Sequence, residues 1–520
     1  MVCLCFLLHM NFERDQLLVE KETLQEKCGI AAVYSLQPNK DQLRVVIIAG
    51  SGVQHRGQNG TGIAMMTEKG IFAHRRQGLI RDVFPNEFVE EHTQATRWAM
   101  IHCRYGTNGG YDNENLQPIT AKAQYGTEIA VSHNGQIVAI NELAQARGLE
   151  ITEGASDTTI LTQILAAQEG SDWDEKVVNL VRQVKGSFSL VIGIDDDMYV
   201  IRDPMGIRPL FISQNDSNWL VASETHVFDK VGVNHVRPIL RGEILKLTPS
   251  GPQILQEGHE GQGNFCDFEW SYVSRPNSNM PDNGNDSENW LSFSTFRERC
   301  GATLASEAPV EADLVIGIPD SGVAAGVGYA NESGIPYHQL ILRDHYDREG
   351  DGRTFMTDSD PSNIKRRVFG KLSFVQDPST WQGKRVIIVD DSIVRSNTSD
   401  VINKILHNLG VSEIHWRVAF PEIPHTCHLG VSMRGEEELI AAQLGSDEQE
   451  IAAKIGATSV HYISHSGFIR ARTGKMVTPE NPREIFLVNG GCGGCVTGIY
   501  PVSKEGLIYD SREPEFSAKQ

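Results

Sequence analysis

The stretch EKCGIAAVYS, residues 26–35, is the most informative feature of the sequence. A Cys-Gly pair opens an apolar run typical of a strand, after a charged lead of 27 residues. Four further stretches follow in order: QHRGQNGTGIA (54–64), RYGTNGG (104–110), SHNGQI (132–137) and ASDTT (155–159). Far downstream, VIIVDDSIVRSNTSD (386–400) reads as a buried strand that ends in two acids and a polar loop before a helix.

Composition limits the class of protein. A chain of 520 residues predicts two to four domains, and 40% hydrophobic with 22% charged residues fits a globular protein with sizeable cores. The net charge of −20 argues against a nucleic-acid or anionic-membrane partner. No apolar run approaches the roughly 18 residues that span a membrane. The apolar start MVCLCFLLHM lacks a basic region and a cleavage site, so we expect a cytoplasmic protein, with Met10 as an alternative start.

The periodicity changes along the chain. Residues 28–258 read as short strands with Gly-rich turns, interrupted by helices such as the one that Ser156 or Asp157 can cap. Such a pattern predicts a layered α+β domain. Residues 251–289 are rich in Gly, Asn, Asp, Ser and Pro, and within this region the stretch NSNMPDNGNDSENW (277–290) predicts a loop or linker. Beyond it, buried strands alternate with helices, which predicts a parallel sheet.

The stretches quoted above, in their order, resemble one family over about residues 28–500: the glutamine phosphoribosylpyrophosphate amidotransferases, or amidophosphoribosyltransferases. The resemblance implies an αββα N-terminal-nucleophile glutaminase domain, followed by an α/β type I phosphoribosyltransferase domain with a parallel sheet. It divides the chain into a propeptide (1–27), a type 2 glutamine amidotransferase domain (28–258) and a phosphoribosyltransferase domain (259–520).

Cys28 is the candidate nucleophile of the glutaminase. A thiol is partly ionised near neutral pH and intrinsically nucleophilic. If the chain is cut before Cys28, its own α-amine, with a pKa of ~8, can serve as the general base. The alternative from the Cys-Gly pair alone is a buried structural cysteine.

The resemblance assigns the other glutaminase residues. An oxyanion hole is implied at Asn134 and Gly135, while from the residues alone Asn-Gly also predicts a type I′ hairpin turn. The glutamine-binding residues implied are Arg56, Arg104, Thr107 and Asp157, with Arg104 for the α-carboxylate and Asp157 for the α-ammonium.

The strand-and-loop at 386–400 carries its own chemistry. Asp390 and Asp391 stand where the strand ends and can hold ribose hydroxyls and Mg²⁺, although acids that merely cap a helix are the alternative. The loop from Ser392 to Ser399 presents N–H groups and hydroxyls to a 5′-phosphate at a helix N-terminus. The resemblance implies further phosphoribosyl pyrophosphate contacts at Asp320, Ser321, Gly322, Tyr346, Arg353, Thr354, Lys371, Arg395, Ser396, Asn397 and Thr398, and Mg²⁺ ligands at Ser321, Asp390 and Asp391.

The chain departs from the family pattern at both sites. The differing positions are Asn59, Gly60, Gly106 and Asn108 in the glutaminase, and Arg343, His345, Phe369, Ser373, Ser396 and Asn397 in the second site, with an inserted DREGDG. Fewer cationic side chains near a polyanionic substrate predict weaker binding of phosphoribosyl pyrophosphate. The family usually has Gly where Ser396 stands, and Gly permits φ > 0.

Four cysteines form a candidate metal site. Cys266, Cys427, Cys492 and Cys495 match the positions that ligate a [4Fe–4S] cluster in one branch of the family. The C-x-x-C spacing by itself is shared with zinc and dithiol sites, so a structural zinc is the rival. The implied role of the cluster is structural: it holds distant segments of the chain together and takes part in no redox step. Cys103 and Cys300 are expected in the core.

The resemblance implies the first step of purine biosynthesis: ammonia from glutamine displaces pyrophosphate from C1 of phosphoribosyl pyrophosphate. The implied substrates are glutamine and phosphoribosyl pyrophosphate, and the implied inhibitors are purine nucleotides. The implied assembly is a homotetramer. Two alternatives stay open. One is a regulatory paralogue that binds phosphoribosyl pyrophosphate or nucleotide, and the other is a glutaminase that feeds a different acceptor.

Overall fold

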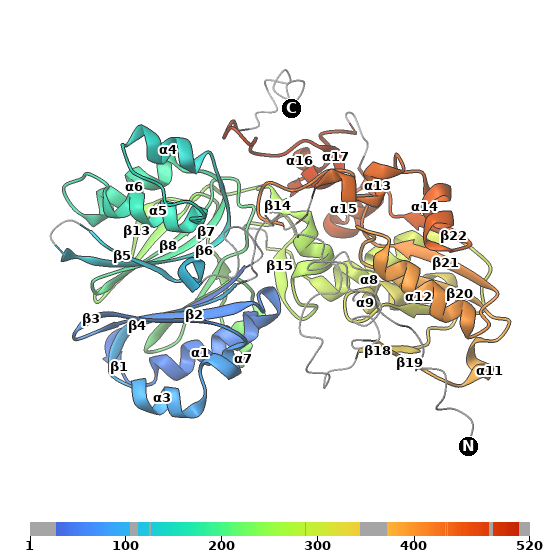
Figure 1. Ribbon diagram of the computed structural model, residues 1–520, viewed down its shortest axis with the longest axis horizontal. Helices are drawn as coiled ribbons and strands as arrows, with labels where there is room; N and C mark the ends of the chain where they lie inside the picture. Colours follow the sequence, from blue (N-terminus) through green and yellow to red (C-terminus); the bar gives the residue numbers. More distant parts are fainter. Residues whose placement is uncertain are drawn as a thin grey trace, which may run out of the picture.

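A computed structural model describes residues 28–104, 113–123, 126–285, 288–343, 372–431, 433, 435–477 and 482–508. These residues form two parts that lie side by side along the longest axis of the molecule (Figure 1). The expected propeptide lies outside the described residues.

The N-terminal part consists of two antiparallel sheets packed face to face, with helices on both outer faces (Figure 1). The first sheet contains, in spatial order, β11 (Arg237–Pro238), β9 (Phe211–Gln214), β10 (Asn218–Ala222), β1 (Cys28–Asn39), β4 (Thr96–Arg104), β2 (Gly60–Thr67) and β3 (Gly70–Gln77). The second contains β13 (Gly251–Gln256), β12 (Ile244–Thr248), β8 (Asp197–Arg202), β7 (Lys185–Ile194), β6 (Glu128–Val138) and β5 (Ile119–Lys122). The helices are α1 (Gln42–Val53), α2 (Ile80–Val83), α3 (Asn86–His92) and α7 (His226–Lys230) by the first sheet, and α4 (Ile140–Ala146), α5 (Asp157–Ala166) and α6 (Trp173–Gln183) by the second. This arrangement confirms the αββα fold class.

Strand β1 is buried on both faces, which explains its unbroken apolar sequence. Side chains alternate between the faces of a strand. Ile30 and Tyr34 pack between the two sheets, whereas Ala31 and Val33 pack in the core that includes helix α1. Cys28, the first residue of the strand, is fully buried.

The C-terminal part is built on a four-stranded parallel sheet, as the alternating pattern predicts. Its order is β17 (Leu314–Gly317), β20 (Arg385–Asp390), β21 (Glu413–Val418) and β22 (Ser459–Tyr462). The helices are α8 (Phe293–Glu307), α9 (Gly322–Ser333), α11 (Pro378–Trp381), α12 (Asn397–Asn408), α13 (Ile440–Gln443), α14 (Glu448–Ile455), α15 (His465–Thr473), α16 (Ile485–Val488) and α17 (Gly494–Thr497). A small sheet pairs β18 (Ile341–Arg343) with β19 (Leu372–Phe374). Because β17 and β20 are parallel neighbours, their carboxyl ends open at the same edge, where ligands bind in such sheets.

The segment 251–289, which includes most of the predicted loop, contains several short elements. Its elements are β13, β14 (Phe265–Cys266), which pairs with β23 (Gly491–Cys492), a π-helical turn (Glu269–Val273), and β15 (Asn279–Pro281), which pairs with β16 (Trp290–Ser292). The predicted loop at 277–290 contains β15, and its described residues from there to β16 lie in turns, bends or irregular structure, so the prediction holds for that turn and missed the short strand pair. Phe265 and Trp270 precede the predicted loop and are fully buried by tertiary packing.

The length and polarity of the helices show whether any of them could span a membrane. Across the described ranges, no helix is long and apolar enough to cross a bilayer.

Candidate active sites

Cys28 and two of the predicted glutamine-site residues lie together at one edge of the first sheet. Cys28 pairs in register with Arg104, the last residue of β4, which also pairs with Gly60 of β2. Arg56 donates from Nε to the carbonyl oxygen of Cys28 at 3.0 Å. All three side chains are buried, so water has little access to the nucleophile in this structure.

Asn134 and Gly135 lie in the middle of strand β6, paired with Ser189 and Phe188 of β7, so the hairpin-turn alternative is wrong. Gly135 has φ +147°, and an added Cβ would lie 2.0 Å from the Ser187 carbonyl oxygen, so the position requires glycine. The Asn134 side chain is buried, and neither of its polar atoms has a hydrogen-bond partner among the residues that the structure describes. An unsatisfied buried amide is a ready donor for a developing oxyanion.

Asp157 is tied to the same strand. It is the first residue of α5, and its carboxylate accepts hydrogen bonds from the backbone N–H of Ile137 at 2.9 Å and of Thr158 at 2.7 Å. Ser156 is the helix cap, since its hydroxyl accepts a first-turn N–H at 3.1 Å. Thr107, the remaining predicted residue, lies outside the described residues.

A buried charge cluster adjoins Cys28, and of its members only Arg56 was predicted as a site residue from the sequence. Arg56 donates to Glu224 at 2.8 Å and to Glu269 at 2.6 Å, and Arg208 contacts Glu269 at 3.2 Å. Burial alone would raise the pKa of Glu269, but the Arg56 and Arg208 guanidiniums outweigh it and hold the pKa below its usual range. The available signal was a glutamate between two aromatic residues in FEW, because a charge in an apolar run needs a buried partner.

The two parts of the molecule meet beside the Asn134–Gly135 strand. The carbonyl oxygen of Leu429 accepts hydrogen bonds from Arg208 at 2.6 Å and from the Ser187 hydroxyl at 2.7 Å. A Cβ added at Gly430 would lie 2.9 Å from the carbonyl carbon of Gly135. A loop of the C-terminal part therefore supports the strand that carries the candidate oxyanion hole.

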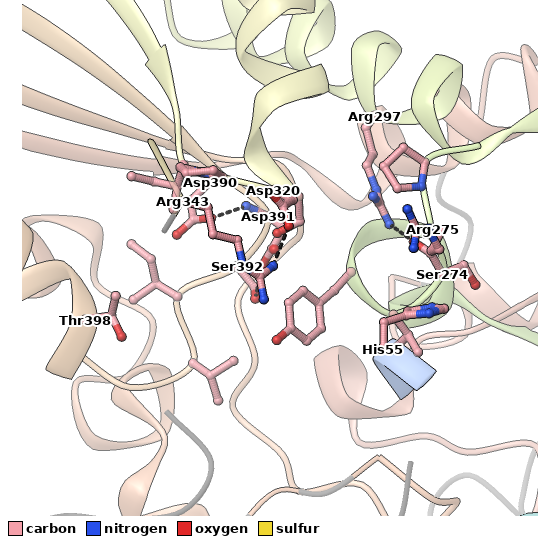
Figure 2. Close-up of a pocket in the computed structure, with 18 of the residues that line it drawn as sticks. His55, Ser274, Arg275, Arg297, Asp320, Arg343, Asp390, Asp391, Ser392 and Thr398 are labelled. Atoms are coloured by element: carbon pink, nitrogen blue, oxygen red, sulfur yellow. Dashed lines mark hydrogen bonds and ion pairs between the residues drawn. The ribbon is translucent and has the colours of Figure 1, made fainter. Parts of the chain in front are cut away.

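A second site opens at the carboxyl ends of β17 and β20 as a pocket of about 640 Å³ (Figure 2). The predicted residues that line it are Asp320, Ser321, Asp390, Asp391, Ser392, Arg395, Thr398 and Ser399. Gly322, Ser396 and Asn397 adjoin these residues at the starts of α9 and α12. His55 and Gln58 of the N-terminal part line the same pocket, so both parts contribute to its wall.

Asp390 and Asp391 form the acidic end of the pocket. The Asp391 N–H donates to the Asp390 carboxylate at 2.8 Å, and the Ser392 hydroxyl donates to Asp391 at 2.7 Å. Burial, followed by the adjacent Asp391 charge, raises the pKa of Asp390 well above its usual range. Such a pair favours a cation or a ribose hydroxyl donor. The described residues hold no group of three His, Cys, Asp or Glu side chains arranged for a metal ion, so a bound Mg²⁺ would need oxygens from substrate or water.

The predicted phosphate loop runs into the start of helix α12. Ser396 precedes the helix with φ −69°, an ordinary right-handed conformation, so its backbone does not require the glycine that is usual in the family. The Thr398 hydroxyl lines the pocket and has no hydrogen-bond partner within the described ranges. Unpaired groups at a helix N-terminus suit a phosphate. Arg395 turns toward Glu438, with 3.0 Å between Nε and the carboxylate.

The segment 344–371 lies outside the described residues. It contains the predicted contacts Tyr346, Arg353, Thr354 and Lys371, and the departures His345 and Phe369. Arg343, just before it, lines the pocket and pairs with Asp320 (Figure 2).

The four matched cysteines converge where the two parts meet. Cys266 pairs in register with Cys492 across β14 and β23, and all four are buried without a disulfide. Burial raises the pKa of Cys266 to about 12, while nearby Arg208 lowers it and the Cys427 sulfur raises it further. Burial raises the pKa of Cys492 well above its usual range, and the nearby sulfurs of Cys266, Cys427 and Cys495 raise it further. The four thiols are near enough to affect one another's pKa, but neither they nor any other three His, Cys, Asp or Glu side chains of the described residues are grouped closely enough to hold a metal ion in this structure.

Fold and sites together define a glutamine amidotransferase joined to a phosphoribosyltransferase. Residues 108–230 match the family described as glutamine amidotransferase domain. The amidophosphoribosyltransferase of Synechocystis sp. is 33% identical to this chain, and the match covers 94% of this chain and 93% of the relative. The amidophosphoribosyltransferase of Bacillus subtilis is also 33% identical, and the match covers 93% of this chain and 96% of the relative. The chain belongs to the amidophosphoribosyltransferase family.

Solved structures agree. One described as the allosteric regulatory enzyme of purine biosynthesis has a TM-score of 0.78 at 32% identity, covering 93% of this chain and 97% of its own. The Bacillus subtilis glutamine phosphoribosylpyrophosphate amidotransferase, complexed with ADP and GMP, has a TM-score of 0.77 at 32% identity, covering 93% and 98%.

Proposed function

We propose that this protein transfers ammonia from glutamine to C1 of phosphoribosyl pyrophosphate, giving 5-phosphoribosylamine, glutamate and pyrophosphate, as the first step of purine biosynthesis. The observation that carries the proposal is the shared pocket: residues of the glutaminase part form one wall of a cavity that ends in Asp390 and Asp391. The part of the chain that releases ammonia at Cys28 thereby also forms a wall of the acceptor pocket. We propose the same domain limits that the resemblance implies, 28–258 and 259–520.

The glutaminase half-reaction follows from Cys28 and its neighbours. After removal of residues 1–27, the α-amine of Cys28 takes the thiol proton, and Sγ attacks the glutamine carboxamide. Asn134 and the Gly135 N–H stabilise the oxyanion of the tetrahedral intermediate. As the intermediate collapses to the thioester, the α-ammonium of Cys28 returns its proton to the nitrogen, the C–N bond breaks and ammonia leaves. Water then releases glutamate from the thioester. Arg104 and Asp157 hold the α-carboxylate and α-ammonium of glutamine.

In the second half-reaction, the nitrogen of ammonia forms a bond to C1 while the C1–O bond to pyrophosphate breaks. Asp390 and Asp391 bind ribose hydroxyls, and the loop from Ser392 to Ser399 holds the 5′-phosphate at the start of α12. Ser321 and the two aspartates would hold Mg²⁺, which neutralises pyrophosphate charge when bound. The right-handed backbone of Ser396 supports retained phosphate binding despite the departure from glycine.

We propose that Cys266, Cys427, Cys492 and Cys495 bind a structural [4Fe–4S] cluster. The support is four buried, reduced thiols contributed by three separate chain segments. One zinc ion is the rival occupant. Iron, sulfide and zinc analysis of anaerobically purified protein separates the two: about four iron and four sulfide per chain are expected, and one zinc without iron refutes the cluster.

Three further properties belong to the proposal. We expect a cytoplasmic enzyme. We expect a homotetramer. Purine nucleotides are the expected inhibitors, which the ADP and GMP complex of the Bacillus subtilis relative supports.

The deciding experiment measures pyrophosphate release by anaerobically purified protein with glutamine or with ammonia, beside an N-terminal mass. Turnover with both nitrogen donors and a chain that starts at Cys28 are expected. Binding of phosphoribosyl pyrophosphate without pyrophosphate release would instead identify a regulator. Glutamine hydrolysis without either would identify a glutaminase with another acceptor. Full activity in a chain that retains residues before Cys28 would refute the α-amine mechanism.

A further inference from the structure

Gln117 is a fully buried side chain that joins two pieces of the candidate glutamine site. Its Oε1 accepts a hydrogen bond at 2.6 Å from the backbone N–H of His133, the residue before Asn134. Its Nε2 donates at 3.0 Å to the hydroxyl of Thr158, the residue after Asp157. One amide therefore connects strand β6, which carries the candidate oxyanion hole, to helix α5, which carries the candidate anchor for the α-ammonium.

The fold brings this side chain into place by ending a strand early. Ile119 of β5 lies opposite Val131 of β6, and the same register continued by two residues would place Gln117 opposite His133. Strand β5 begins at Ile119, however, and Pro118 has no N–H to donate. The Gln117 side chain therefore meets the His133 N–H at the edge of β6 where the neighbouring strand would otherwise pair.

The segment that carries Gln117 is itself fixed. Arg75 Nη1 donates to the carbonyl oxygen of Leu116 at 3.4 Å and to that of Pro118 at 3.2 Å. A Cβ added at Gly62 would collide with the Gln117 carbonyl oxygen, so strand β2 of the first sheet packs directly against this backbone. An amide that is bonded at both ends and held on a fixed segment can act as a rigid spacer.

The direct bond between Asp157 and strand β6 is not equivalent to this spacer. The Asp157 carboxylate accepts the Ile137 N–H at 2.9 Å, but the α-ammonium of glutamine would use the same carboxylate. The two Gln117 bonds do not involve that carboxylate, so they can persist when substrate is bound. Because a misplacement of about 1 Å can cost about 10²-fold in rate, a spacer that survives binding affects turnover directly.

We propose that Gln117 is a positioning residue that fixes the distance between the oxyanion hole and the α-ammonium anchor, and thereby makes the glutaminase selective for amides that carry an α-amino group. This inference rests on the proposed function, because it takes glutamine as the substrate and Asp157 as the group that holds its α-ammonium. It adds to that function a residue that lies outside every sequence stretch that defined the site.

The test compares the kcat/KM for ammonia release from L-glutamine with that from glutaramate, the same amide without the α-amino group. Both substrates are measured on one sample, so an unfolded fraction cancels from the ratio of the two values. Gln117→Met keeps the length of the side chain and loses both hydrogen bonds. Its ratio should fall roughly ten- to hundredfold below that of the wild type, because the two ends of glutamine are no longer held in register.

The other end of the link provides a second set of variants. Thr158→Val removes the hydroxyl and should lower the ratio as Gln117→Met does. Since the two residues act through one link, the double variant should be no worse than either single variant. Thr158→Ser keeps the hydroxyl and should keep most of the wild-type ratio.

Gln42→Met is the matched control. Gln42 is another fully buried glutamine of the N-terminal part, but its amide joins helix α1 to strand β10 by donating to Asn218 at 2.7 Å. This substitution should lower the melting temperature and leave the ratio unchanged.

The inference is overturned if Gln117→Met stays within about twofold of the wild-type ratio, or if Gln42→Met lowers the ratio equally. It is also overturned if Thr158→Val keeps the wild-type ratio, or if the effects of the two substitutions simply add. Failure of the proposed function has a different signature, in the wild type itself. A wild type that releases no ammonia from glutamine overturns the glutaminase, and one that uses glutaramate as well as glutamine overturns the role of Asp157.

Discussion

Arg56→Met should be among the most destabilising single substitutions in the N-terminal part. The Arg56 side chain is fully buried and donates four hydrogen bonds: one from Nε to Cys28, two from Nη1 to Glu224 and Glu269, and one from Nη2 to Glu269. Methionine fills much of the volume but leaves two buried carboxylates without their shared cation. Removing one partner of a buried ion pair costs about 3–5 kcal/mol.

That loss corresponds to a melting temperature about 6–20 °C lower, at roughly 2–4 °C per kcal/mol for a domain of this size. Circular dichroism in thermal and urea unfolding at pH 7.5 measures it. The control is Lys122→Met. The Lys122 side chain is 76% exposed and pairs at 3.2 Å with Glu128, which is itself 30% exposed, so its loss should cost at most about 1 kcal/mol.

The pH dependence of the difference provides a second readout. In the wild type, the pKa of Glu269 is below its usual range, so its contribution to stability is present above pH ~4.5 and is lost as the pH falls through the lower folded-state pKa. In Arg56→Met, burial is less opposed and the pKa rises above that of the unfolded chain. Ionisation then destabilises the variant as the pH rises.

The gap between wild type and Arg56→Met should therefore be larger at pH 8 than at pH 5.5. Adding Glu269→Gln to the variant should recover part of the loss at pH 8. A variant within 1 kcal/mol of the wild type, or a gap that is independent of pH, would contradict the assignment of a buried ionised cluster.

Three further outcomes test the two sites. Gly135→Ala should lower glutamine hydrolysis at least ~100-fold, because its Cβ would lie 2.0 Å from the Ser187 carbonyl oxygen; unchanged kinetics would exclude the strained geometry. Asn134→Ala should lower kcat for glutamine by about 10²–10³ and spare ammonia-dependent pyrophosphate release, whereas a pure rise in KM would argue against an oxyanion role. Asp390→Asn should lower pyrophosphate release by roughly ten- to hundredfold with glutamine hydrolysis retained; the exposed helix cap Asp377, changed to Asn, serves as its control.

Much of the architecture could be predicted from local sequence. The apolar run at Cys28 predicts a strand, and the alternation of buried strands with helices in the C-terminal half predicts a parallel sheet; the structure has both. These predictions succeed because the residues involved are neighbours in the chain, so periodicity and turn chemistry act directly on them. The Asn134–Gly135 pair shows the limit, since a strong turn signal was overridden by pairing with β7.

The sequence by itself determined the two chemistries, through short contiguous motifs whose residue types fit a thiol nucleophile and a phosphate site. Only the tertiary structure decided how these sites are joined. Arg56 meets Glu224 and Glu269 across sequence separations of 168 and 213 residues, and no local pattern encodes such a contact. The physical reason is desolvation: a buried charge is stable only beside its partner, and which partner that is depends on how the whole chain packs.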